Sequence, residues 1–256
     1  MTLPDFFKEL KKRNPLLYNF GWFNVILLVI AIVLCTVDNT QITGINAWIK
    51  PMKFAISITV YAWTFGWILH YIPNQKQINF ISRGVVICML VENSLIFMQA
   101  ARGVRSHYNI TTVFDIAVFN TMGIFILINT FIILYTIILF FQKIELETPL
   151  LWAWRAGLIF FFLGGISGGI MAGALHHTIG AADGGPGLPF LNWSTLAGDL
   201  RSPHFITMHG LQAIPLTTLL FFRSSRSLVL LFSVAYLGLC LWLHWLAFSG
   251  IPVISI

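Results

Sequence analysis

Residues Phe114–Phe141 read FDIAVFNTMGIFILINTFIILYTIILFF, and Asp115 is the single charged residue among them. An apolar stretch of about 20 residues is long enough to cross the hydrocarbon core of a bilayer as a helix. This stretch is longer than that and carries its one charge at its beginning. It therefore predicts a transmembrane helix.

Six further stretches have the same character, and they are Tyr18–Val37, Pro51–His70, Ile81–Ala101, Pro149–Leu175, Pro203–Phe222 and Ser227–Phe248. Apolar residues make up 57% of the 256 positions and charged residues only 9%, whereas roughly a quarter of the residues of a soluble domain are charged. The sequence predicts an all-α integral membrane protein. We expect a single domain of seven transmembrane helices over residues 1–256, in which residues 1–17 are a basic cytoplasmic N-terminal segment.

The positive charges predict how the chain is oriented. A cytoplasmic N-terminus places ten of the fifteen Lys and Arg residues in short cytoplasmic segments, as the positive-inside rule requires. The C-terminus then lies outside, and residues 176–202 form a long outer loop. This distribution explains the net charge of +6 without a nucleic-acid partner. We expect a multi-pass protein of the cell membrane, specifically a bacterial inner membrane, in contact with membrane lipids.

Five cations break this rule because they fall on the outer side. Positive residues in that position are kept for pairing with acids or for binding an anion. We therefore interpret the outer polar groups as a substrate-binding set for an anionic or amphiphilic small molecule, made of Lys50, Lys53, Gln99, Arg102, Arg105, Asp199 and Arg201. The alternative is that these charges form ordinary ion pairs at the membrane rim. Asp115 has its own alternative, because its spacing from Thr112 fits a helix cap.

Six of the seven histidines fall near the same outer end of the apolar segments, namely His107, His176, His177, His204, His209 and His244. Imidazoles gathered in this way can bind metal or transfer protons. We take His176, His177, His204 and His209 as candidate metal ligands, with a divalent metal such as zinc as the first cofactor to consider and haem as the second. His204 and His209 differ by about 140° around an ideal helix, so they do not form the same-face pair of a helical metal motif.

Glu92 lies near the middle of the third apolar segment. An acid at membrane depth must be neutralised, paired or solvated, and such residues usually have a functional role. We predict Glu92, His107 and His209 as catalytic residues that transfer protons. The alternative is a protonated Glu92 held by Asn120 or another buried amide.

The Ser106-His107 pair, Asp115 and the two late histidines of seven predicted spans resemble the seven-span zinc hydrolases that include alkaline ceramidases and progestin and adipoQ receptors. That family has a late His-x-x-x-His, whereas four residues separate His204 from His209 here, in the sixth span instead of the seventh. The resemblance is therefore one of arrangement, and it implies zinc-dependent hydrolysis.

Three classes of function fit these features. The first is a membrane-embedded enzyme, metal-dependent or acid/base, that acts at the outer face on a lipid-like or anionic amphiphilic substrate. The second is a transporter or small-ligand receptor that uses the same pocket, and the third is a redox protein that binds haem or quinone. The absence of a visible inverted repeat favours the enzyme over the transporter.

Overall fold

The computed structural model describes residues 2–255, and within that range the chain forms eight α-helices and two small antiparallel sheets. It separates into two compact units, Met1–Ile132 and Ile133–Ile256, whose boundary falls inside helix α5 (Val113–Phe140). Each unit has its own helices and its own small sheet. The single seven-helix domain expected over residues 1–256 stays a prediction.

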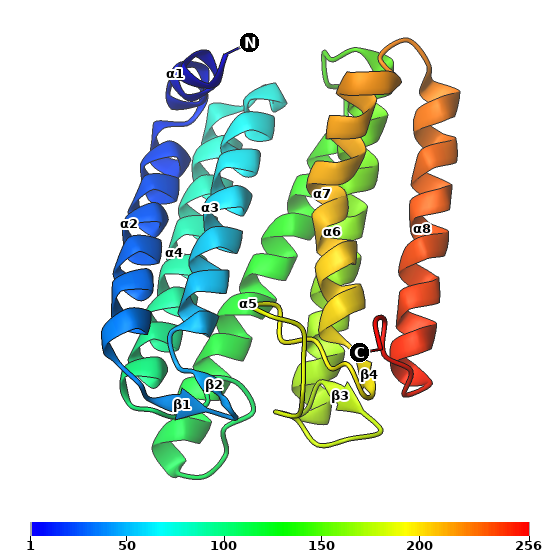
Figure 1. Cartoon of the computed structure of the whole chain (residues 1–256). Helices are drawn as coiled ribbons and strands as arrows, with labels where there is room; N and C mark the ends of the chain where they lie inside the picture. Colours follow the sequence, from blue (N-terminus) through cyan, green and yellow to red (C-terminus); the bar gives the residue numbers. More distant parts are fainter. Residues whose placement is uncertain (1, 256) are drawn as a thin grey trace. The chain divides into compact units, whose positions relative to one another are not determined.

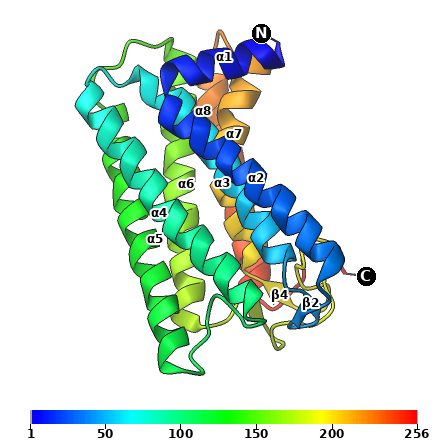
Figure 2. The same ribbon diagram turned by 90° about the vertical axis from the view of Figure 1, so that its left-hand side faces the viewer.

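In the first unit, α2, α3 and α4 run side by side and alternate in direction (Figures 1 and 2). Their bounds, with those of the short helices that extend them, are α1 Leu3–Arg13, α2 Pro15–Val37, α3 Ile49–Ile68, the 3-10 helix η1 Leu69–Tyr71 and α4 Gln75–Ala101. The strands β1 (Gln41–Ile42) and β2 (Ile45–Asn46) form a hairpin between α2 and α3. Asp38 anchors that hairpin by accepting a 2.8 Å hydrogen bond from the Trp48 indole.

Helix α1 lies in the segment that we expected only to be a basic N-terminal stretch. Thr2 and Asp5 form a capping box at its start, and Leu10 is fully buried. The ring of Phe6 stacks on Trp67 of α3 with 5.1 Å between centroids. The capping-box spacing and the apolar residues among the lysines are sequence signals that could have predicted this helix.

The second unit contains α6 (Thr148–Ala174), α7 (Arg201–Phe221) and α8 (Arg226–Phe248). Strands β3 (Thr178–Ile179) and β4 (Gly198–Asp199) pair antiparallel and close the base of the long loop that precedes α7 (Figure 1). The predicted spans at Pro51, Pro149 and Pro203 begin one or two residues earlier than expected. Proline is tolerated through the first helical turn because the N–H groups there have no intrahelical partner.

Glycines allow α6 and α7 to pack closely. A Cβ atom on Gly157 would lie 3.0 Å from the Leu211 backbone, and one on Gly164 would lie 2.9 Å from the Met208 nitrogen. Gly165, Gly169 and Gly173 repeat every four residues, the spacing of a small-residue packing face, but a Cβ on Gly169 or Gly173 would meet nothing within 4 Å. The close face instead follows residues seven apart, which lie on one side of a helix.

Six of the helices are long and apolar enough to cross a membrane, and they are α2, α3 with η1, α4, α5, α6 and α8. Large apolar side chains such as Ile26 and Val33 of α2 and Leu231 and Val234 of α8 are exposed. Such faces would be costly in water and are stable against lipid tails. The fold is therefore that of a polytopic helical membrane protein. The seventh predicted span is present as the helix α7, whose polar residues leave it outside this set.

Candidate functional site

The first unit brings three predicted site residues together. The Nδ1 atom of His107, in the loop between α4 and α5, lies 3.0 Å from the Lys50 ammonium in the first turn of α3. Its Nε2 atom lies 3.4 Å from Oε1 of Glu92 on α4. Lys50, His107 and Glu92 thus form a continuous chain of ionisable groups, which we call the Glu92 cluster.

The chemistry of lysine assigns the histidine tautomer. An ammonium group donates hydrogen bonds and cannot accept them, so Nδ1 of His107 accepts and the ring proton sits on Nε2. That proton is directed to the side of the ring where Glu92 lies. The Ser106 hydroxyl, 3.2 Å from Nδ1, is a second donor to the same atom. This is the arrangement in which an imidazole can accept a proton on one nitrogen and release one from the other.

Burial lowers the pKa of His107 below its usual range, the charge of Lys50 lowers it further, and Glu92 opposes both. Aromatic rings surround the imidazole, with centroids 5.7 Å away for Phe54, 6.0 Å for Tyr108 and 6.5 Å for Phe119. Tyr108 adopts the left-handed region at φ 59°. A bulky residue there is strained, and such strain is held in place by the surrounding contacts.

Glu92 is 1% exposed, and within residues 2–255 neither of its carboxylate oxygens has a hydrogen-bond partner. His107 is the polar side chain next to it, with 3.4 Å between Nε2 and Oε1. The expected amide neighbour is not found, because Asn120 is exposed. Asn93, the next residue, donates a 2.8 Å hydrogen bond to Asn24 of α2, while its own carbonyl oxygen is buried and without a partner. Burying a carboxyl group without a hydrogen bond is costly, and this cost marks Glu92 as a candidate functional residue.

Gln99, Arg102 and Asp115 form a separate cluster. Arg102 pairs with Asp115 at 2.7 Å and also donates to the Gln99 side-chain oxygen. Asp115 is in addition a helix-cap residue, because its backbone N–H donates to the Thr112 hydroxyl at 3.1 Å. The Arg102 guanidinium is thus already engaged, which favours the interpretation as a rim ion pair. Arg105 is exposed and makes no ion pair in the described chain. Lys53 is half-buried, three residues after Lys50 on the same helix.

In the second unit, Asp199 and Arg201 hold the long loop. The Arg201 guanidinium reaches Asp199 oxygens at 2.6 and 2.9 Å and also donates to the Asn192 carbonyl, while Ser194 N–H donates to Asp199 at 2.8 Å. Burial raises the pKa of Asp199, but the hydrogen bonds and charge of Arg201 outweigh it and hold that pKa below its usual range. Both residues therefore fold the loop, and their charges are not free for a substrate.

The four candidate metal ligands all belong to the second unit, and hydrogen bonds within the protein orient each imidazole. His176 lies 3.1 Å from the Thr178 carbonyl and His204 2.8 Å from the Gly164 carbonyl. His177 lies 3.3 Å from Asp183 and His209 bonds Gln212. Within residues 2–255 no group of three or more His, Cys, Asp or Glu side chains is arranged to hold a metal ion. The structure therefore gives the predicted metal set no support.

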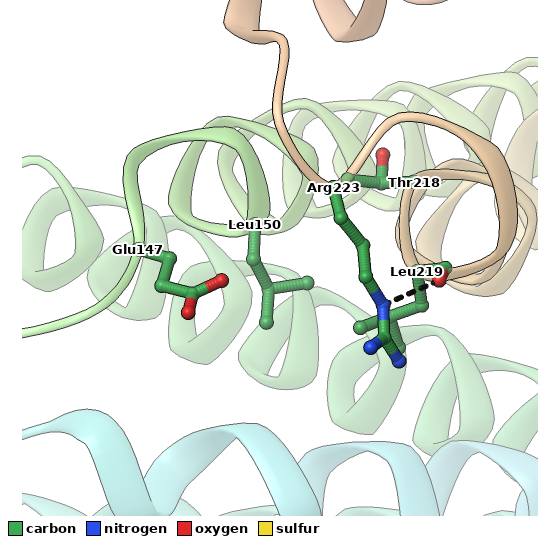
Figure 3. A pocket seen from close by; sticks show the side chains of 5 residues that line it. All are labelled: Glu147, Leu150, Thr218, Leu219 and Arg223. Atoms are coloured by element: carbon green, nitrogen blue, oxygen red, sulfur yellow. Dashed lines mark hydrogen bonds between the residues drawn. The ribbon is translucent and has the colours of Figure 1, made fainter.

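A shallow pocket opens between the start of α6 and the end of α7. Figure 3 shows Glu147 and Arg223 on opposite sides of it, with Leu150 between them. The Arg223 side chain bonds the Leu219 carbonyl of its own helix at 2.7 Å. None of the predicted site residues lines this pocket, so it adds nothing to the candidate site.

Comparisons with protein-family models, with curated proteins and with solved structures each find no match. The geometry of the clusters is therefore what indicates function, and the Glu92 cluster is the strongest of them. The hydropathy pattern alone identifies Glu92 as an acid inside an apolar segment. No local sequence pattern predicts that Lys50 contacts His107, because the two residues are 57 positions apart.

Proposed function

We propose that this chain is a multi-span membrane protein whose Glu92 takes up and releases a proton through His107. The observation that carries the proposal is a buried carboxylate without a hydrogen bond, 3.4 Å from an imidazole that also contacts Lys50. When Lys50 gives a proton to Nδ1 and Nε2 gives one to Glu92, two opposite charges disappear together. In a medium of low dielectric constant that exchange costs less than moving an isolated charge.

The topology that fits this function has seven spans, with the N-terminus in the cytoplasm of a bacterial cell and the C-terminus outside. Helix α7 is the additional span, because the glycines of α6 hold it against a helix that itself crosses. The Glu92 cluster then opens toward the outer face. The half-buried Lys50 and Lys53 and the exposed Arg105 supply positive charge beside it.

The preferred use of this proton is acid/base catalysis on an amphiphilic or anionic substrate. General acid/base catalysis needs a side chain that is positioned to give or take a proton, and Glu92 beside His107 is such a group. The cations at the cluster would attract an anionic head group, while the apolar helices accommodate an acyl chain.

A specific observation favours a second use, proton-coupled transport. The polar groups continue past Glu92 into the helices, through Asn93 and its 2.8 Å bond to Asn24. Both amides are buried. Polar groups in series at membrane depth mark the paths of protons and solutes in transporters.

Two assays on the full-length protein separate these uses. In vesicles with an entrapped pH dye and an imposed potassium diffusion potential, transport predicts a proton flux that Glu92→Gln abolishes and the control Glu147→Gln retains. In mixed micelles with a total bacterial lipid extract, catalysis predicts a product, detected by mass spectrometry, that forms with the wild type and not with Glu92→Gln. If neither signal depends on Glu92, the proposed function is wrong.

A further inference from the structure

Ser167 and His244 form a second chemically distinctive pair, which lies entirely in the second unit. The Ser167 hydroxyl oxygen on α6 is 2.9 Å from Nε2 of His244 on α8. The other ring nitrogen, Nδ1, is 2.8 Å from the Cys240 backbone carbonyl, one helical turn before it. The imidazole is therefore fixed at both ends.

These contacts determine where the protons are. A carbonyl oxygen only accepts, so Nδ1 of His244 carries the hydrogen and donates it to Cys240. Nε2 is then the bare nitrogen, and the Ser167 hydroxyl donates to it. This is the tautomer that a general base needs next to a serine nucleophile, with the Cys240 carbonyl in the orienting role that a carboxylate has in a catalytic triad.

Ser167 differs from the other helical hydroxyl groups in having this partner. Six other helical hydroxyl groups bond the carbonyl four residues earlier in their own helix, namely those of Thr59, Thr64, Thr121, Thr130, Thr218 and Ser233. That local bond is the ordinary way to satisfy a hydroxyl in an apolar helix. Ser167 instead donates across to another helix, and its partner is a base.

The surroundings indicate what kind of molecule can reach the pair. Leu163 and Ile170 lie on the Ser167 side of α6, at the i−4 and i+3 positions, and both are exposed. Leu241 and Phe248 lie at the i−3 and i+4 positions relative to His244 on α8 and are also exposed. Helix faces of this kind meet lipid. Ser167 itself is only 5% exposed, so the pair lies just beneath a lipid-facing surface, and we take the hydrocarbon side as the side of approach. The fitting substrate is therefore an ester with an apolar acyl chain.

We propose that Ser167 is a nucleophile for acyl transfer from such an ester, with His244 as its general base. Nε2 takes the Ser167 proton while Oγ bonds the carbonyl carbon and the carbonyl electron pair moves to its oxygen. Collapse of that intermediate breaks the bond to the leaving alkoxide, which takes the proton from Nε2 and departs as an alcohol. Water then attacks the acyl-serine, gives its proton to Nε2, and releases the acid and the free hydroxyl.

The test is covalent labelling of the full-length protein in detergent micelles with an alkyl fluorophosphonate, which reacts with activated serines. The expected result is one adduct per chain by intact mass, mapped to Ser167 in the peptide digest. Ser167→Ala should lose it, and His244→Ala should slow labelling by about 100-fold, the lower end of what a general base contributes.

A control variant separates chemistry from structure. Ser233→Ala removes a hydroxyl bonded to its own helix, so this variant should label at the wild-type rate. A wild-type protein without an adduct on Ser167 would overturn the proposal, even if a variant failed to fold. Labelling of wild type and His244→Ala at the same rate would overturn the role of His244. Both results are independent of the Glu92 assays.

Discussion

The Nε2 atom of His107 lies 3.4 Å from Oε1 of Glu92, although the two residues belong to a loop and to the interior of a helix. The contact joins a buried acid to Lys50 through one imidazole. It also means that the charge state of each group controls that of the others.

Neighbouring charges should move the His107 pKa in opposite directions. Burial and Lys50 lower that pKa, so Lys50→Met should raise it, whereas Glu92→Gln should lower it further because Glu92 opposes the shift. Histidine-selective NMR across pH, with His107→Asn to assign the resonance, measures both changes. Lys143→Met, at an exposed lysine, is the matched control. Shifts of the same sign in the two variants would be inconsistent with this arrangement.

The same lowered pKa has a consequence for stability. A histidine whose pKa is lower in the folded state binds fewer protons there than in the unfolded chain. The stability that depends on neutral His107 should be present above about pH 6.5 and fall as the pH drops through that value. Thermal unfolding of wild type and His107→Gln from pH 7.5 to 5 tests this, and the variant should show the shallower loss.

Asp199 should be required for the order of the long loop. Asp199→Asn removes the charge that Arg201 and the Ser194 N–H bind, at a site that is 2% exposed. Removing one partner of a buried ion pair costs about 3 kcal/mol. Limited proteolysis between residues 180 and 200 should become faster, while Glu145→Gln, at an exposed acid, leaves it unchanged. Because the folded pKa of Asp199 is lowered, the wild-type loop should keep its order above about pH 4 and lose it below that value.

Helix packing gives a prediction with an internal control. Gly164→Ala places a methyl group 2.9 Å from the Met208 backbone nitrogen and should cost about 1–3 kcal/mol. Gly169→Ala enters open space on the same helix, so it should be neutral or stabilise by up to about 1 kcal/mol through helix propensity. Unfolding in mixed micelles of increasing SDS content compares the two variants. Equal destabilisation by both would show that α6 and α7 do not pack through this face.

The helices could be predicted because a helix that crosses a bilayer must be about 20 residues long and largely apolar. All seven predicted segments are helices, and the capping residue Thr112 was predicted from local spacing. The sites were harder, because they depend on contacts between distant residues. Lys50 reaches His107 across 57 residues and Ser167 reaches His244 across 77. The clustering of the histidines was visible in the sequence, but His176, His204 and His244 are oriented by backbone carbonyls, which a sequence pattern does not reveal.

The central claim is that Glu92 exchanges a proton within the folded protein. Infrared difference spectroscopy of the protein in lipid, recorded while the pH is stepped, detects the carbonyl stretch of a protonated carboxyl group. Proton exchange at Glu92 predicts a band that changes with pH, disappears in Glu92→Gln and stays in Glu147→Gln. Identical difference spectra for wild type and Glu92→Gln would contradict it.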